Sequence, residues 1–165
     1  MKIWQKIISF VFLFLFAVII TGCNKNEFYP ASDLLVTNVD PYSILPTSND
    51  FSSISDGVIT VELLNAVPCN IVGYDISYKT SLKEPIDNLS VTNIPTNIPI
   101  REQGGTAELT IKPYSQQLLD LFQNTSSNIS PVEATVTIHF KDINKNETLR
   151  TATFLLYKYE EASSE

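Results

Sequence analysis

The sequence predicts a mainly β fold over residues 33–159, an antiparallel sandwich of about seven strands with one short crossover helix. Apolar residues alternate with polar ones over several short segments, the pattern of strands that are buried on one face. Clusters of Pro, Gly, Asn, Ser and Asp separate these segments, and only one segment of the domain has helical spacing. Many short strands in one domain-sized stretch favour two packed sheets.

Four strands are expected in the first half of the domain. They cover residues 33–39, 43–45, 58–64 and 69–80. The third carries an apolar face made of Ile59, Val61 and Leu63. In the fourth, alternation places four apolar or aromatic residues on one face, namely Val72, Tyr74, Ile76 and Tyr78.

Residues 81–105 are irregular and contain Pro85, Pro95 and Pro99. Because a proline has no N–H to donate within a central strand, we expect an edge strand or a loop here. A strand at 106–112 follows, with Ala107, Leu109 and Ile111 inward. Residues 116–122 then have the spacing of a two-turn helix capped by Ser115.

The last two strands, 132–140 and 148–159, are predicted to form a hairpin around a turn at 142–147. The first of them alternates strictly, with an apolar face of Val132, Ala134, Val136, Ile138 and Phe140. The second has apolar residues on both faces, so its pattern leaves open which face is inward. The polar tail 160–165 is expected to fray.

The amino terminus has the pattern of a secretory signal. A short basic segment, 1–6, precedes residues 7–20, which are apolar except for Ser9. As a helix these fourteen residues would span about 21 Å, which is short of the ~30 Å hydrocarbon core of a bilayer. A signal-peptide helix over residues 1–22 is therefore favoured over a stable membrane span.

This segment ends in Ile20-Thr21-Gly22-Cys23, which resembles the lipobox of bacterial lipoprotein signal peptides. The resemblance implies removal of residues 1–22, a thioether between Cys23 and diacylglycerol, and acylation of the new amino terminus, for example with palmitate. Two or three acyl chains hold a protein durably at a membrane. The alternative is a plain secretory signal, or a membrane anchor, with an incidental cysteine.

The anchor would place the protein in the bacterial cell envelope. Asn24 stands where Asp would retain a lipoprotein at the inner membrane of well-studied enteric bacteria, which favours the outer membrane in an organism that has one. Residues 23–32 comprise the lipidated cysteine and a short polar tether, so the folded domain is expected close to the bilayer.

The expected strand order resembles an immunoglobulin-like or fibronectin type III-like domain over residues 33–159. The resemblance is architectural, because the immunoglobulin hallmarks are missing. Trp4 is the only tryptophan and lies in the signal segment, and Cys69 has no partner for a disulfide if Cys23 is lipidated. A fold of this kind does not by itself imply a function.

Charge excludes some partners. Without residues 1–22 the chain has 9 basic and 18 acidic residues, a net charge of −9. A nucleic-acid binder needs clustered Lys and Arg, so nucleic acid is not expected as a partner.

Few residues offer catalytic or metal chemistry. His139 is the only histidine and is expected at the surface, and Cys69 is expected as a small buried residue. Asp142, Asn144 and Asn146 have the spacing of a calcium loop, but Glu147 occupies the position that needs Gly, so an ordinary hairpin turn is favoured. We therefore predict no enzyme activity, no cofactor and no metal site.

Two classes of function remain. The first is a non-catalytic protein-binding or scaffolding module, whose partner would pair with an edge that includes Ile94, Ile98, Ile100 and Arg101. The prolines of that edge also suit the opposite purpose, an edge blunted against aggregation, which we favour over a binding role. The second class is a small-ligand or carbohydrate binder that uses aromatic residues at loop tips, namely Tyr42, Phe51 and Tyr114.

Overall fold

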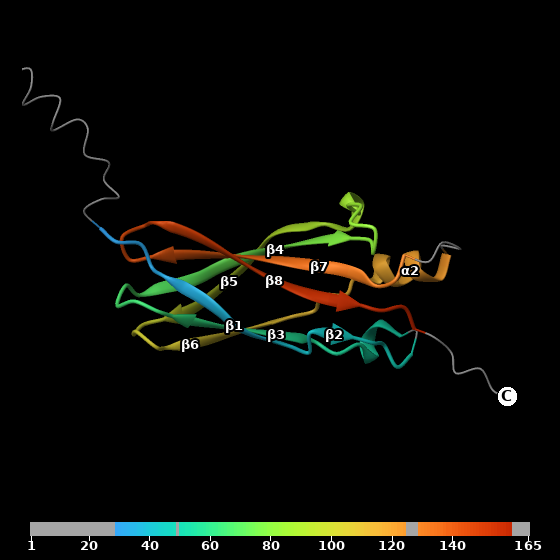
Figure 1. Ribbon diagram of the computed structural model, residues 1–165, viewed down its shortest axis with the longest axis horizontal. Coiled ribbons are helices and arrows are strands. Elements are labelled where there is room, and N and C mark those ends of the chain that lie inside the picture. The colour runs from blue at the N-terminus through green and yellow to red at the C-terminus, as the bar shows by residue number, and fades with distance from the viewer. Residues whose placement is uncertain (1–28, 49, 125–128, 160–165) are drawn as a thin grey trace, which may run out of the picture.

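The computed structural model describes residues 29–48, 50–124 and 129–159, and it contains two β-sheets and one α-helix (Figure 1). The smaller sheet is antiparallel in the order β1-β3-β6, with β1 (Leu34–Asp40), β3 (Gly57–Leu63) and β6 (Thr106–Ile111). The signal segment 1–22, Cys23, most of the tether and the tail 160–165 lie outside the described residues.

The larger sheet has the order β2-β8-β7-β4-β5. Its strands are β2 (Ser43–Ile44), β4 (Cys69–Lys79), β5 (Val91–Ile100), β7 (Val132–Asp142) and β8 (Glu147–Leu156). The short strand β2 pairs with β8 in parallel, so this sheet is mixed rather than antiparallel throughout. The described residues thus form eight strands, one more than the seven expected.

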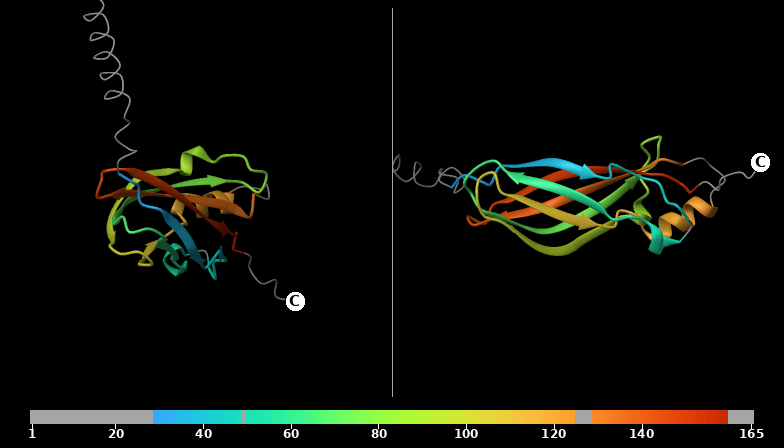
Figure 2. Two further views of the ribbon diagram at one scale, coloured as in Figure 1. Left: turned by 60° about the vertical axis from the view of Figure 1, so that its left-hand side comes forward. Right: turned by 90° about the horizontal axis from the view of Figure 1, so that it is seen from below.

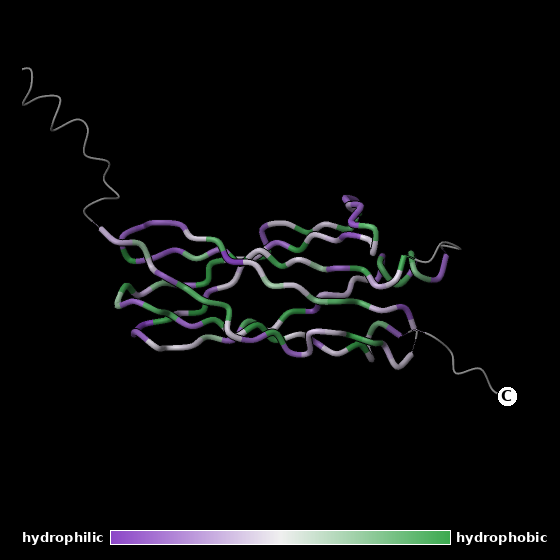
Figure 3. The backbone as a smooth tube through the Cα atoms, viewed as in Figure 1, coloured by the Kyte–Doolittle hydropathy of each residue, from purple (hydrophilic) through white to green (hydrophobic). Residues whose placement is uncertain are grey.

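The two sheets enclose one hydrophobic core. Side chains that face each other from both sheets are fully buried, among them Ile59 and Val61 of β3, Ile138 of β7 and Phe154 of β8. Figure 3 shows the matching alternation of hydrophobic and hydrophilic residues along the strands. The prediction of a mainly β fold with two packed layers is therefore confirmed.

The predicted hairpin is formed by β7 and β8, and its register is regular. Its pairs run without a shift from Val132↔Leu156 to Lys141↔Glu147. The five expected inward residues of β7 are buried, and so are Ala152, Phe154 and Leu156 of β8. The inward face of β8, which the sequence left open, is thereby settled by its partner strand.

The prediction for β4 is wrong at its first half. Ile71 is fully buried, whereas Val72 is 39% exposed. The reason is a β-bulge: the register with β7 shifts between Ile71 and Gly73, so Val72 has no partner and points outward. Beyond the bulge, Ile76 and Tyr78 are buried as expected, and Tyr74 is half-buried.

The irregular segment contains a long edge strand. β5 pairs only with β4 among the described residues, and its register shifts twice, the second time next to Asn93, whose φ is 57°. Pro95 and Pro99 both lie within it, which an edge strand tolerates when their nitrogens face away from the neighbouring strand.

The predicted helix is α2 (Gln116–Asn124), which buries Leu118, Leu119 and Phe122. The Ser115 hydroxyl accepts a hydrogen bond from the Leu118 N–H at 3.1 Å and caps its first turn. Two short 3₁₀ turns, η2 (Phe51–Ser53) and η3 (Asp87–Leu89), complete the fold. Figure 2 shows that α2 lies at the end of the sandwich opposite to the first described residues. No helix of the described ranges is long and apolar enough to span a bilayer.

Candidate functional site

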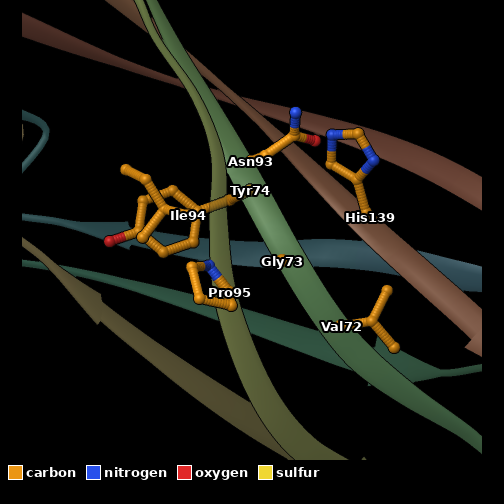
Figure 4. A pocket seen from close by; sticks show the side chains of 7 residues that line it. All are labelled: Val72, Gly73, Tyr74, Asn93, Ile94, Pro95 and His139. Carbon is orange, nitrogen blue, oxygen red and sulfur yellow. The ribbon is translucent and has the colours of Figure 1, made fainter.

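The bulges of β4 and β5 create a shallow depression beside the open edge of the larger sheet (Figure 4). Its volume is about 260 Å³. We call it the bulge site and define it by its lining residues, which are Val72, Gly73, Tyr74, Asn93, Ile94, Pro95 and His139. They come from three adjacent strands, β4, β5 and β7.

Gly73 allows β5 to approach β4 at this point. A Cβ atom at position 73 would lie 2.9 Å from the carbonyl oxygen of Ile94, which is closer than side chains tolerate. Any other residue would push the two strands apart. The glycine therefore helps to bring Ile94 and Pro95 to the rim of the depression.

Asp75 joins the same three strands with its two carboxylate oxygens. One oxygen accepts a hydrogen bond from the backbone N–H of Asn93 at 2.7 Å, and the other lies 2.7 Å from His139 Nε2. The Asn93 N–H, and to a smaller extent His139, hold the pKa of the Asp75 carboxyl below its ordinary value. Asp75 is therefore ionised at neutral pH and ties β5 and β7 to β4.

His139, which was expected at the surface, is partly exposed and contacts the Asp75 carboxylate. Its side chain is 34% exposed, and the Asp75 side chain 29%. In Figure 4 the Asn93 side chain and the His139 ring point toward one another above the depression. An imidazole with one nitrogen held by a carboxylate has a fixed orientation and presents its other nitrogen for a further hydrogen bond.

A carboxylate–histidine pair also occurs in catalytic sites, where it activates a nucleophile. The bulge site is not lined by Ser, Thr or Cys. Burial raises the pKa of the Tyr74 hydroxyl, which leaves that group protonated at neutral pH. Within the described residues no three His, Cys, Asp or Glu side chains are placed to hold a metal ion. The arrangement suits recognition, with apolar walls and a few oriented polar groups.

The four residues predicted for the binding edge do not form one exposed surface. Ile94 and Ile98 are half-buried against the core, and Arg101 is exposed beyond the end of β5. Ile100, only 2% exposed, belongs to the core and has no side chain surface to offer a partner. Of these four, only Ile94 lines the bulge site.

The three aromatic residues expected at loop tips differ in their exposure and contacts. Tyr42 is 54% exposed, but Tyr114 is buried and its hydroxyl donates to the carbonyl of Tyr157. The ring of Phe51 is covered by the Lys112 ammonium, 4.6 Å from the ring centroid. Of these three residues, only Tyr42 keeps a free aromatic surface for stacking.

Cys69 and the Asp142 turn have the structural roles that were favoured. Cys69 is a buried free cysteine, and burial raises the pKa of its thiol. The Asp142 carboxylate accepts hydrogen bonds from the Asn146 N–H at 2.8 Å and from the Asn146 side chain at 3.0 Å, which closes the hairpin turn.

Sequence reasoning did not find Asp75. In the linear pattern it is one polar residue in an alternating strand, and His139 lies 64 residues away. Their contact depends on the register shift at Val72, which brings Gly73 rather than Val72 opposite His139. A bulge of this kind leaves no clear signal in apolar alternation.

Comparison with known proteins gives no assignment. No family model and no curated protein matches the chain. Among solved structures, a Bordetella pertussis protein assigned as ApaA is similar at 19% identity and a TM-score of 0.46, over 77% of this chain and 94% of that one. The alkylpurine DNA glycosylase AlkC of Pseudomonas fluorescens is similar at 14% identity and a TM-score of 0.41, over 85% of this chain and 33% of the glycosylase. Both TM-scores are below the level at which a shared fold is inferred.

Proposed function

We propose that this chain is a lipid-anchored protein of the bacterial cell envelope whose domain binds a protein partner, without catalysis, at the bulge site. The lipobox-like ending at Cys23 supports the anchor and, with Asn24, an outer-membrane location in organisms with two membranes. The observation that carries the binding role is the depression beside the open edge of β5.

For the domain we propose an immunoglobulin-like topology. In such domains strands A, B, E and D form one sheet, and in the variable type the other sheet contains G, F, C and C′. The described residues form a counterpart of A-B-E without strand D. The orders β1-β3-β6 and β8-β7-β4-β5 support this assignment, with the crossover helix α2 before β7. The lack of a disulfide and of a tryptophan in the domain distinguishes it from antibody domains.

The partner is expected to present an extended segment. Peptides that lie along a sheet edge gain affinity from main-chain hydrogen bonds and specificity from pockets for their side chains. Pro95 and Pro99 cannot donate a backbone hydrogen bond to an added strand. The blunted edge therefore limits strand addition, and side-chain contacts with the bulge site should contribute most of the affinity.

The anchor is tested by metabolic labelling with palmitate. The wild-type protein should incorporate label and fractionate with membranes, and Cys23→Ser should lose the label because the acceptor thiol is gone. A Cys23→Ser protein that still takes up palmitate would overturn the lipoprotein assignment. Cys69→Ala serves as the matched control, since that thiol is buried and its loss should leave labelling unchanged.

The binding site is tested by photo-crosslinking in intact cells. A crosslinking amino acid at position 72 or 95 should capture one defined envelope protein, and the same group at position 108, exposed on β6, should not. Gly73→Ala should abolish the crosslink at position 95 because it separates β5 from β4. Equal capture at positions 72, 95 and 108 would contradict a binding role for the bulge site.

One observation supports a second candidate, the binding of a small ligand or a carbohydrate. A cleft of about 370 Å³ lies between η3 and α2, lined by Asn88, Leu89, Gln117, Asp120, Leu121 and Asn124. Amide and carboxylate groups are suitable partners for sugar hydroxyls. Titration with a glycan library distinguishes the two candidates: saturable binding that is lost in Gln117→Ala and kept in Gly73→Ala would favour this cleft.

A further inference from the structure

The end of the sandwich at which the chain enters is built from four segments that are bound to one another. They are residues 29–33 and the turns at 64–68, 101–105 and 142–147, and we call them together the entry end. In Figure 1 they lie at the left, opposite α2. The turns are connected by hydrogen bonds from the Gln103 side chain to the Leu64 carbonyl at 2.9 Å and from the Ile143 N–H to the Pro68 carbonyl at 3.2 Å.

The last residues of the predicted tether are part of this end. Asn65 Nδ2 donates to the carbonyl of Ala31 at 2.8 Å, and Asn144 Nδ2 donates to that of Pro30 at 3.2 Å. The N–H of Ser32 donates to the Asp142 carboxylate, also at 3.2 Å. Of residues 23–32, the structure describes 29–32, and Pro30, Ala31 and Ser32 all take part in these contacts.

We infer that the entry end is a membrane-docking face, which contacts the headgroup region of the bilayer that holds the anchor. This inference rests on the proposed lipidation of Cys23. Five residues separate Cys23 from Tyr29. The six Cα–Cα steps from Cys23 to Tyr29 reach about 20–22 Å when fully extended, so the entry end stays within roughly that distance of the lipid.

The exposed side chains of this face suit a bilayer surface. Ile143, at the tip of the β7–β8 turn, is 69% exposed, and Tyr29 beside that turn is 61% exposed. Aromatic residues favour the membrane–water interface, and an aliphatic side chain at a turn tip can insert between headgroups. Lys145 follows in the same turn, and a lysine at this depth keeps its ammonium in the headgroup layer.

The distribution of charged side chains also favours the entry end as the face that contacts lipid. The domain is acidic overall, but the entry end together with the adjoining Lys141 has three basic and four acidic residues. Of the four acidic residues, Asp142 is buried and Glu147 is paired with Lys141 at 3.6 Å. Repulsion from anionic lipid is therefore weak here. The short connection also turns docking into an intramolecular event with an effective concentration in the millimolar range, so a weak contact is sufficient.

Spin labels on the acylated full-length protein test this inference. The protein is reconstituted into vesicles of phosphatidylethanolamine and phosphatidylglycerol, with a nitroxide at Ile143→Cys or, as the matched control, at Leu82→Cys, which is 80% exposed at the opposite end. Because Cys69 is buried and Cys23 is blocked by lipid, unmodified protein serves as the labelling blank. Site 143 should show a several-fold higher ratio of oxygen to nickel-chelate accessibility than site 82.

A second pair of variants separates docking from folding. With the label at Lys145→Cys, Ile143→Asp should lower the accessibility ratio to that of site 82, whereas Leu82→Asp should leave it unchanged. Both variants should have the melting temperature of the parent protein. Equal, water-like ratios at sites 143 and 82 in palmitate-labelled protein would overturn docking and leave the anchor intact. Absence of palmitate from the wild-type protein would instead overturn the proposed function, and docking with it.

Discussion

The β7–β8 hairpin and the β4–β5 pair lie in the same sheet but differ in regularity. Every pair of the hairpin keeps one register from Val132↔Leu156 to Lys141↔Glu147. The β4–β5 pair changes register twice, and β4 is bulged against β7 as well. The regular pair contributes a large part of the core, and the irregular pair forms the bulge site.

The difference contrasts a regular ladder with a bulged one within a single sheet. A regular ladder pairs its backbone groups and buries alternate side chains, which leaves a flat outer face. A bulge leaves one residue without a partner and turns neighbouring side chains to new directions. Here it exposes Val72, brings Asp75 within reach of His139, and admits β5 close to Gly73.

The largest effect is expected in the regular hairpin. Ile138→Ala should lower the free energy of unfolding by about 2–5 kcal/mol, because the side chain is fully buried and its loss leaves a cavity. Thr137→Ala, one position away on the outer face, should cost within about 0.5 kcal/mol. Chemical denaturation measures both. Similar losses at the two positions would show that the outer face of β7 carries as much stability as the inner one.

The burial of Tyr78, in the part of β4 beyond the bulge, should make the stability of the protein depend on pH in the alkaline range. Burial raises the pKa of Tyr78 to about 12, against about 10 in the unfolded chain. Between these values the unfolded phenol loses its proton first, so wild-type stability should fall by about 2–3 kcal/mol as the pH rises from 10 to 12.

Tyr78→Phe removes this loss. At pH 7 it should cost about 1 kcal/mol, since the Tyr78 hydroxyl donates to the Pro113 carbonyl at 2.9 Å. Above pH 11 the variant should be the more stable protein. Unfolding curves from pH 7 to 12 measure the crossing. Parallel curves for the two proteins would mean that Tyr78 is accessible to solvent.

A smaller effect is expected at the bulge. Gly73→Ala should cost about 1–3 kcal/mol, because the new Cβ meets the Ile94 carbonyl and one strand must move. Ser77→Ala, an exposed position of the same strand, should be close to neutral. Hydrogen exchange should show faster exchange in β5 of Gly73→Ala and unchanged exchange in β8. Protection of β5 as in the wild type would contradict a close approach at Gly73.

The smallest effect concerns the Asp75–His139 contact. A carboxyl with a lowered pKa stabilises the folded state at neutral pH, and this contribution is lost as the pH falls through the folded-state pKa. Asp75→Asn should therefore lower the free energy of unfolding slightly at pH 7, by less than about 1 kcal/mol for this partly exposed group. The difference in stability between the wild type and Asp75→Asn should disappear as the pH is lowered below about 4, the ordinary pKa of an Asp carboxyl. A constant difference from pH 7 to pH 3 would show that the charge of Asp75 does not contribute to the stability of the fold.

How well each region could be predicted from the sequence also depends on whether its strands are regular or bulged. The faces of β3, β6 and β7 and the Ser115 cap agree with the sequence pattern, because an unbroken strand has period two and a cap is a local contact. The candidate site was not predictable in this way. Asp75 and His139 are ordinary polar residues in their own strands, and only the pairing of β4 with β7 brings them together.

Some features of this protein were determined by the sequence alone. Alternation and turn residues specify a mainly β domain, and the resemblance at Cys23 on which the proposed anchor rests is a feature of the sequence alone. Others were decided only in the tertiary structure: the bulge that inverts Val72, the burial of Ile100, and the attachment of residues 29–33 to the entry end. The physical reason is range. Hydrophobic periodicity and turn propensity act between neighbours in the chain, whereas register and backbone contacts are chosen by the free energy of the whole sheet, which no single segment encodes.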